Sequence, residues 1–196
     1  MILVQDSFVD VSTGIPNLYC VQTVTSQKAA SGLNKYLPET RNIPLNILLQ
    51  VNTSGEDSKS GLPPLTSISD ASSSELFSLA KYVVTECPRL RLQGLMTIGA
   101  LSASISHDAP NEDFTTLVKA RDALHDALKS DCANSVWGDG DDRRLLLSMG
   151  MSADFEDALR VGADVVRVGT GIFGARPKKG GDANIEEATQ AEITKA

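Results

Sequence analysis

Residues 145–176 read LLLSMGMSADFEDALRVGADVVRVGTGIFGAR. Two apolar runs, Leu145–Met149 and Val165–Val168, stand in this segment, and small or hydroxyl-bearing residues follow each of them. Between the runs, Ser152 is placed to cap a short helix that Gly162 can end. The order is therefore strand, turn, helix, strand and glycine-rich turn, which is typical of a parallel β/α unit.

The same alternation extends towards the N-terminus. Three further apolar runs are typical of strands buried on both faces: Leu18–Val24, Leu45–Val51 and Leu92–Ile98. Helical patterns follow them, with predicted starts at Ser26, at Ser72 with Glu75 as a capping box, and at Asn111. The order β-α-β-α-β-α-β-α-β predicts a parallel sheet, either an open doubly wound sheet or a (β/α) barrel.

Neither architecture is complete in this chain. No G-x-G-x-x-G motif follows the first apolar run, which weakens the dinucleotide-binding form of the doubly wound sheet. Five units are too few for a closed eight-stranded barrel, which typically takes about 250 residues. The Ser-, Gly- and Pro-rich segments Gly55–Ala71 and Ala100–Pro110 are expected to be weakly structured loops.

Composition excludes several classes of function. The chain has 196 residues, 18 basic against 25 acidic side chains and a net charge of −7, which argues against nucleic-acid binding and a polybasic membrane anchor. No apolar run approaches the roughly 20 residues of a membrane span, and the N-terminus lacks the basic region of a secretory signal. The three cysteines lie far apart in the sequence, which fits reduced thiols. The chain has only two histidines, which argues against a zinc site.

The turns after the last two apolar runs are the strongest candidates for a binding site. Both fall at the carboxyl edge of a parallel sheet, where ligands bind in such folds. The turns contain Ser148, Gly150 and Ser152, then Gly169, Thr170 and Gly171. Small residues let backbone N–H groups approach an anion, and hydroxyls add donors. The pair of turns predicts a phosphate cup, with the alternative that the glycines only permit tight turns.

Arg167 interrupts an apolar strand, VVRVG. A buried charge is costly unless it is paired, so the guanidinium must meet an acid such as Asp154 or face a ring nitrogen or anionic group of a ligand. A second polar cluster, residues 52–59, follows another predicted strand. We interpret most of it as a solvated loop with turn chemistry, although Asn52 can reach the mouth of the sheet.

Five segments resemble the pyridoxal phosphate homeostasis proteins, single-domain relatives of the alanine racemase N-terminal barrel: IPNLYCVQTV, PLNILLQVNTSGEDSKSGL, LRLQGLMTIGA, LLSMGMSADFEDAL and VVRVGTGIFGAR. The resemblance runs from Ile15 to Arg176. It implies an α/β fold, the (β/α)₈ TIM-type barrel of fold type III proteins, N-terminally truncated here to about five of eight units. Residues 1–14 are an unplaced N-terminal segment, and 177–196 are a polar tail that we expect to be disordered.

The resemblance also implies a ligand and its contacts. Members of the family bind pyridoxal 5′-phosphate (PLP) and buffer or deliver it without strong catalytic activity. Ser148 would contact the phosphate, Gly169 and Thr170 would wrap it, and Arg167 would face the pyridine nitrogen. The implied partners are PLP and PLP-dependent apoenzymes, and the implied location is the cytoplasm, with a mitochondrial form as the alternative.

One family feature has no counterpart. The family's Schiff-base lysine ends its first strand, whereas none of the nine lysines here ends an apolar run. We therefore expect weak, non-covalent PLP binding and no catalytic residue, with Lys59 the nearest position for an adventitious adduct. The alternatives are a racemase-like PLP enzyme, an unrelated phosphosugar- or phosphate-binding enzyme, and a fragment without function.

Overall fold

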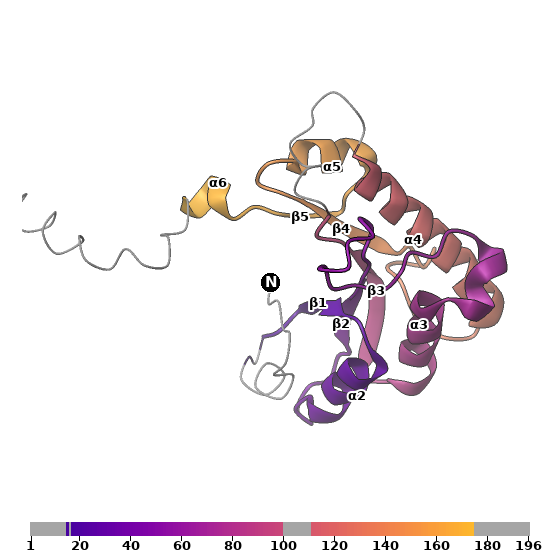
Figure 1. Ribbon diagram of the computed structural model, residues 1–196. Coiled ribbons are helices and arrows are strands. Elements are labelled where there is room, and N and C mark those ends of the chain that lie inside the picture. Colours follow the sequence, from indigo (N-terminus) through magenta and orange to yellow (C-terminus); the bar gives the residue numbers. More distant parts are fainter. Residues whose placement is uncertain (1–14, 16, 100–110, 175–196) are drawn as a thin grey trace, which may run out of the picture.

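The computed structural model describes residues 15, 17–99 and 111–174. Five strands form one parallel sheet: β1 (Cys20–Val24), β2 (Leu45–Gln50), β3 (Leu90–Met96), β4 (Leu146–Met151) and β5 (Val165–Arg167). Their order in the sheet is their order in the chain, β1-β2-β3-β4-β5. A doubly wound sheet reverses its strand order at a switch point, whereas a barrel does not. The described residues therefore form a half-barrel, and the predicted incomplete barrel is confirmed (Figure 1).

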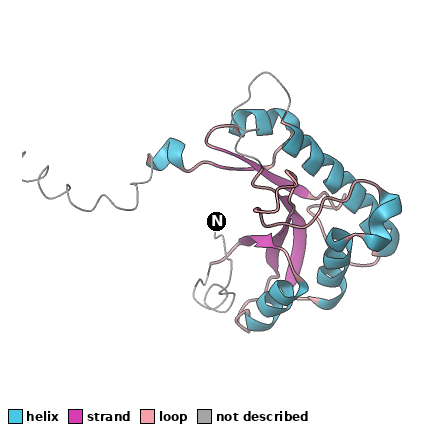
Figure 2. Cartoon of the chain, in the orientation of Figure 1, coloured by secondary structure: helices cyan, strands magenta, loops and turns pink. Residues whose placement is uncertain are grey.

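Helices connect successive strands and lie along one face of the sheet (Figures 1 and 2). They are α2 (Gln27–Tyr36), a 3₁₀ helix η1 (Ile68–Ser73), α3 (Glu75–Glu86), α4 (Glu112–Asp131) and α5 (Phe155–Val161). A last short helix, α6 (Thr170–Phe173), follows β5 and stands apart from the helix layer. No helix in the described ranges is long and apolar enough to cross a membrane.

Three helix starts illustrate how local side chains set the element bounds. Ser26 caps α2 and Asn111 caps α4, as predicted. The predicted start of α3 is two residues too early, because Ser72 lies in the 3₁₀ helix η1. Ser74 is the N-cap, and its hydroxyl accepts a hydrogen bond from the backbone N–H of Phe77 at 3.3 Å. A hydroxyl at this position satisfies one of the unpaired N–H groups of the first turn.

The cap predicted for α5 is also wrong. The N-cap is Asp154, and the hydroxyl of Ser152 makes contacts outside the helix, which are described below. The predicted end is confirmed: Gly162 is the C-cap, with a φ of 99° that favours glycine.

The helix-covered face of the sheet carries the hydrophobic core. Ile47, Leu95 and Leu147 lie on this face of β2, β3 and β4, and each is at most 1% exposed. They belong to one continuous cluster with the apolar faces of α2, α3 and α4. Alternate residues point to opposite faces of a strand, so the neighbours of these three residues lie on the inner face of the half-barrel.

The inner face has a different composition. Strand register places Gln50, Met96 and Ser148 side by side in one layer. Gln22 on β1 and Arg167 on β5 complete the polar character of this face through their contacts with Ser148. The inner face is therefore polar at the carboxyl end of the sheet.

The loop after β2 is more ordered than the sequence predicts. Leu62 pairs with Val51 in a parallel bridge, and the backbone N–H of Leu62 donates to the carbonyl of Gln50 at 2.9 Å. The expectation of a weakly structured loop over Gly55–Ala71 is therefore wrong, because this loop makes backbone hydrogen bonds at the carboxyl end of β2. Ala100–Pro110, residues 1–14 and the tail 177–196 lie outside the described residues.

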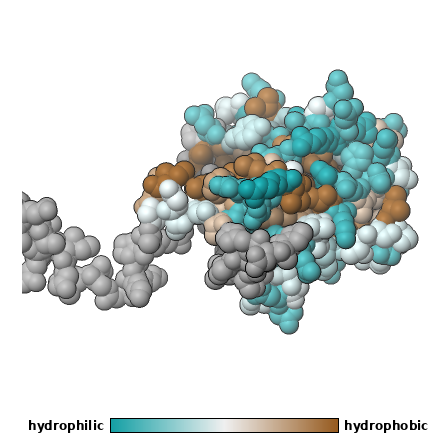
Figure 3. Space-filling view, turned by 90° about the horizontal axis from the view of Figure 1, so that it is seen from above, coloured by the Kyte–Doolittle hydropathy of each residue, from teal (hydrophilic) through white to brown (hydrophobic). Residues whose placement is uncertain are grey.

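The end of the described chain exposes apolar surface. Ile172 and Phe173 on α6 are 68% and 86% exposed, and α6 has no buried residue. Figure 3 shows brown surface at this helix, next to the grey atoms. α6 therefore contributes nothing to the core, and it matters for the candidate site only through its first residues.

Candidate functional site

The turn after β5 directs two backbone donors at one oxygen. The N–H groups of Gly169 and Gly171 donate to the hydroxyl oxygen of Ser152 at 3.0 and 3.2 Å. An added Cβ at Gly169 would meet nothing within 4 Å, so the turn opens to solvent on that side. An oxygen of an anion could accept hydrogen bonds from the same two N–H groups that donate to this hydroxyl. The geometry is that of a small anion-binding cup.

The hydroxyl of Ser148 has other partners than this turn. Its side chain is fully buried on the inner face, where the hydroxyl donates to Oε1 of Gln22 at 2.7 Å and accepts from Nη1 of Arg167 at 3.0 Å. A hydroxyl has one proton, and here Gln22 receives it. A phosphate contact by Ser148 stays a prediction, whereas Ser152 is the serine that the fold brings to the glycine turn.

Arg167 extends over the inner face and does not enter the helix layer. Its Nη1 donates to Ser148, and its Nη2 donates to the backbone carbonyl of Thr97 at 2.7 Å. Both acceptors are neutral atoms. Burial lowers the pKa of the Arg167 guanidinium, because removal from water disfavours the charged form.

Asp154 acts on Arg167 through its charge. The carboxylate opposes the effect of burial on the pKa of Arg167. Its Oδ1 accepts from the backbone N–H of Met151 at 2.6 Å, at the end of β4. Both interpretations of Arg167 therefore keep some support: a carboxylate lies within electrostatic reach, while the hydrogen bonds of the guanidinium go to Ser148 and Thr97.

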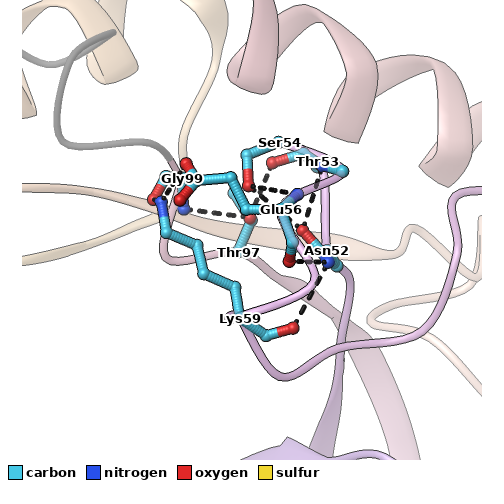
Figure 4. A network of polar contacts seen from close by, with 8 residues as sticks. Asn52, Thr53, Ser54, Glu56, Lys59, Thr97 and Gly99 are labelled. Atoms are coloured by element: carbon cyan, nitrogen blue, oxygen red, sulfur yellow. Dashed lines mark hydrogen bonds and ion pairs between the residues drawn. The ribbon is translucent and has the colours of Figure 1, made fainter.

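A polar network ties the loop after β2 to the end of β3 (Figure 4). The ammonium group of Lys59 donates to the carbonyl of Gly99 at 2.5 Å and pairs with the carboxylate of Glu56 at 2.9 Å. The hydroxyls of Thr53 and Thr97 are 2.8 Å apart. The loop is therefore attached to the residue whose carbonyl holds Arg167, in addition to the turn chemistry that the sequence predicts.

Two contributors were not singled out from the sequence. Thr97 acts through a backbone carbonyl, which leaves no trace in side-chain identity. Gln22 does leave a trace in the sequence, because its amide interrupts the largely apolar run LYCVQTV. It is 7% exposed, and a buried amide requires a partner. That requirement was the available signal.

The described lysines do not project from the sheet. Five of the six lie on helices: Lys28, Lys35, Lys81, Lys119 and Lys129. Lys59 is the one that lies in a loop at the carboxyl edge of the sheet. Its ammonium group is already bonded to Gly99 and paired with Glu56.

The strand order and this edge define an α/β protein of the barrel type, with an anion cup beside a partly buried arginine. The chain belongs to the alanine racemase N-terminal domain family, whose model matches residues 7–177. The match begins within the N-terminal segment that the sequence motifs leave unplaced.

Relatives with similar sequences are named pyridoxal phosphate homeostasis protein, in agreement with the resemblance seen in the motifs. The human protein is 39% identical over 167 residues, which are 83% of this chain and 52% of the human one. The protein of Schizosaccharomyces pombe is 39% identical over 172 residues, 87% of this chain and 62% of the relative. The chain thus spans a little over half the length of these relatives.

Solved structures agree with the fold. PipY of Synechococcus elongatus, solved with PLP bound, superposes with a TM-score of 0.57 at 23% identity, over 89% of this chain and 68% of PipY. Alanine racemase from Corynebacterium glutamicum superposes with a TM-score of 0.51 at 16% identity, over 90% of this chain and 41% of the racemase. At these identities the comparisons support the architecture alone.

Proposed function

We propose that the chain is a PLP-binding protein that takes part in intracellular PLP homeostasis and is not itself an enzyme. One observation carries the proposal: the N–H groups of Gly169 and Gly171 converge on a single oxygen at the sheet edge, in the turn that follows the strand carrying Arg167. A phosphate ester with an aromatic ring nitrogen matches this combination of an anion cup and a cation. The names of the relatives support the same ligand.

The residues present fit the phosphate and the ring. The turn at Gly169 and Thr170, together with Ser152, would hold the phosphate through backbone and hydroxyl donors. Arg167 would face the ring nitrogen, and Ser148 would support its guanidinium. PLP, when bound, supplies an electron-accepting ring. A cationic arginine opposite the ring nitrogen keeps that nitrogen unprotonated and weakens this capacity, which suits carriage of the cofactor better than catalysis on it.

The fit does not extend to a covalent anchor. None of the six described lysines lies on a strand, and the ammonium of Lys59 is held by Gly99 and Glu56. We therefore propose that PLP is held by phosphate and ring contacts alone. Borohydride treatment of the PLP-loaded protein followed by mass spectrometry tests this. We expect no stoichiometric adduct, and one full equivalent on a single lysine would show covalent attachment instead.

Binding itself is tested by titration with PLP and with pyridoxal, which lacks the phosphate. We expect PLP to bind roughly tenfold or more tightly than pyridoxal, because charge-assisted bonds to the phosphate are lost in the second ligand. Thr170→Leu should remove most of this preference, whereas Thr85→Leu, on the exposed surface of α3, should keep it. Equal affinities for the two ligands would refute the phosphate site.

The cellular role is a further part of the proposal. A non-covalent site can release its ligand without a chemical step, so we propose that the chain delivers PLP to PLP-dependent apoenzymes in the cytoplasm. Reactivation of an apoenzyme should proceed faster from the loaded chain than from an equal trace of free PLP. A shortened chain of residues 15–176 should retain the PLP affinity of the full chain, which would confirm these domain boundaries.

A further inference from the structure

One side-chain hydrogen bond crosses the inner face of the half-barrel. The hydroxyl of Ser148 on β4 donates to Oε1 of Gln22 on β1, at 2.7 Å. Two strands, β2 and β3, stand between β1 and β4 in the sheet. The bond therefore depends on the curvature of the sheet, and it joins residues 126 positions apart in the sequence. Gln22 and Ser148 are 7% and 0% exposed, so water does not compete for it.

This bond determines what Ser148 offers to Arg167. A serine hydroxyl has one proton and two lone pairs. Because the proton goes to Gln22, the lone pairs are available to Nη1 of Arg167, which donates to them at 3.0 Å. Nη2 of Arg167 is held separately by the carbonyl of Thr97. Two fixed acceptors, one on each terminal nitrogen, define the plane of a guanidinium group.

We propose that Gln22 is a positioning residue, which acts through Ser148 to fix the orientation of the Arg167 guanidinium on the inner face. The amide provides an acceptor without a negative charge. It therefore orients Arg167 without adding a negative charge beside the guanidinium. What that ligand is rests on the proposed function, whereas the positioning itself is a property of the chain without ligand.

The first test needs no ligand. Restricted rotation of a guanidinium separates its Nη–H signals in nitrogen-edited NMR spectra. In the wild-type chain we expect separated signals for Arg167, assigned by their loss in Arg167→Lys. Gln22→Met removes the acceptor at similar size and should merge the signals. Gln22→Glu restores an acceptor at the same place and should separate them again.

The second test uses PLP as the probe. We expect Gln22→Met to weaken PLP binding by roughly tenfold, the equivalent of about 1.4 kcal/mol. If Gln22 acts through the serine, Gln22→Met should have no further effect in a Ser148→Ala background. Ser148→Ala also serves if Gln22→Met does not fold, because loss of the intermediate group should merge the Arg167 signals while Gln22 is intact.

The outcomes separate the two proposals. Merged signals in Gln22→Met and separated signals in Gln22→Glu support the positioning role, even if the wild-type chain binds no PLP and the proposed function fails. Separated signals in both Gln22→Met and Ser148→Ala would overturn it. So would an equal loss of PLP affinity from Gln22→Met in the wild-type and Ser148→Ala backgrounds, because Gln22 would then act independently of the serine.

Discussion

The two faces of the sheet use the same five strands for different purposes. The outer face consists of aliphatic side chains such as Ile47, Leu95 and Leu147, which pack against the helices in one cluster. The inner face places Gln22, Ser148 and Arg167 in a chain of hydrogen bonds. On the outer face any well-packed apolar residue serves, because dispersion and burial are not directional. On the inner face each polar atom depends on a particular partner.

The difference predicts two kinds of mutational effect. Substitutions on the outer face should change the free energy of unfolding, because they remove buried apolar volume. Substitutions of polar inner-face residues should change the site more than the stability. The largest losses of stability are expected where an added side-chain atom would collide with the backbone of a neighbouring strand.

Gly94 is the position where we expect the largest effect. A Cβ at Gly94 would collide with the backbone of Leu146 on the neighbouring strand, so β3 and β4 would have to separate. Gly94→Ala should therefore cost roughly 3 kcal/mol or more, or prevent soluble expression. Gly55→Ala is the control: Gly55 has a positive φ, which Gly94 does not, but nothing lies within 4 Å of an added Cβ, and we expect a loss of about 1–2 kcal/mol. Urea denaturation measures both, and equal losses would contradict the assigned clash.

Substitutions of Leu147 and of Leu146 test the two faces of the sheet on a single strand, β4. Leu147 is 1% exposed and belongs to the core cluster, whereas Leu146 is only partly buried and lies outside it. Leu147→Ala should cost about 2–5 kcal/mol through lost burial and the remaining cavity. Leu146→Ala should cost clearly less. Chemical denaturation of the two variants decides, and a larger loss at Leu146 would mean that the inner face also supports the core.

Cys20 gives the inner face a pH dependence. It lies two residues before Gln22 on β1, and burial raises the pKa of its thiol from 9.0 to about 11. The unfolded chain therefore loses this proton first as the pH rises. The stability that the neutral thiol contributes is present below pH 9 and is lost between pH 9 and pH 11. Unfolding free energies over this range should fall more steeply in the wild type than in Cys20→Ala, and parallel curves would argue against a buried thiol.

Lys59 should show the smallest effect on stability. Its ion pair with Glu56 is partly exposed, with side chains 25% and 47% accessible, and such pairs contribute about 0–1 kcal/mol. Lys59→Met should therefore lower the unfolding free energy by less than about 1 kcal/mol. Lys119→Met, on α4, is the matched control. A loss at Lys59 as large as that of Leu147→Ala would show that the loop network supports the whole sheet.

Sequence patterns located the elements better than their contacts. The caps at Ser26 and Asn111 were predictable because a side chain near a helix start bonds to its own backbone. The cap of α5 was not, because Ser152 instead accepts hydrogen bonds from Gly169 and Gly171, at least 17 residues away along the chain. Local geometry follows from local sequence, whereas competition from a distant donor does not appear in it.

The alternation of apolar runs and helical patterns in the sequence indicated a parallel α/β sheet. Residues 145–176 by themselves indicated the glycine-rich edge and the unusual placement of Arg167 in an apolar strand. The resemblance of five segments to a barrel family predicted the incomplete barrel, whereas only the tertiary structure decided the partners of the inner-face polar groups. The reason is that periodicity and propensity act over a few residues, while the curvature of the sheet brings β1 and β4 together across two other strands. The partner of Ser148 is set by that curvature, and no short segment of the sequence contains it.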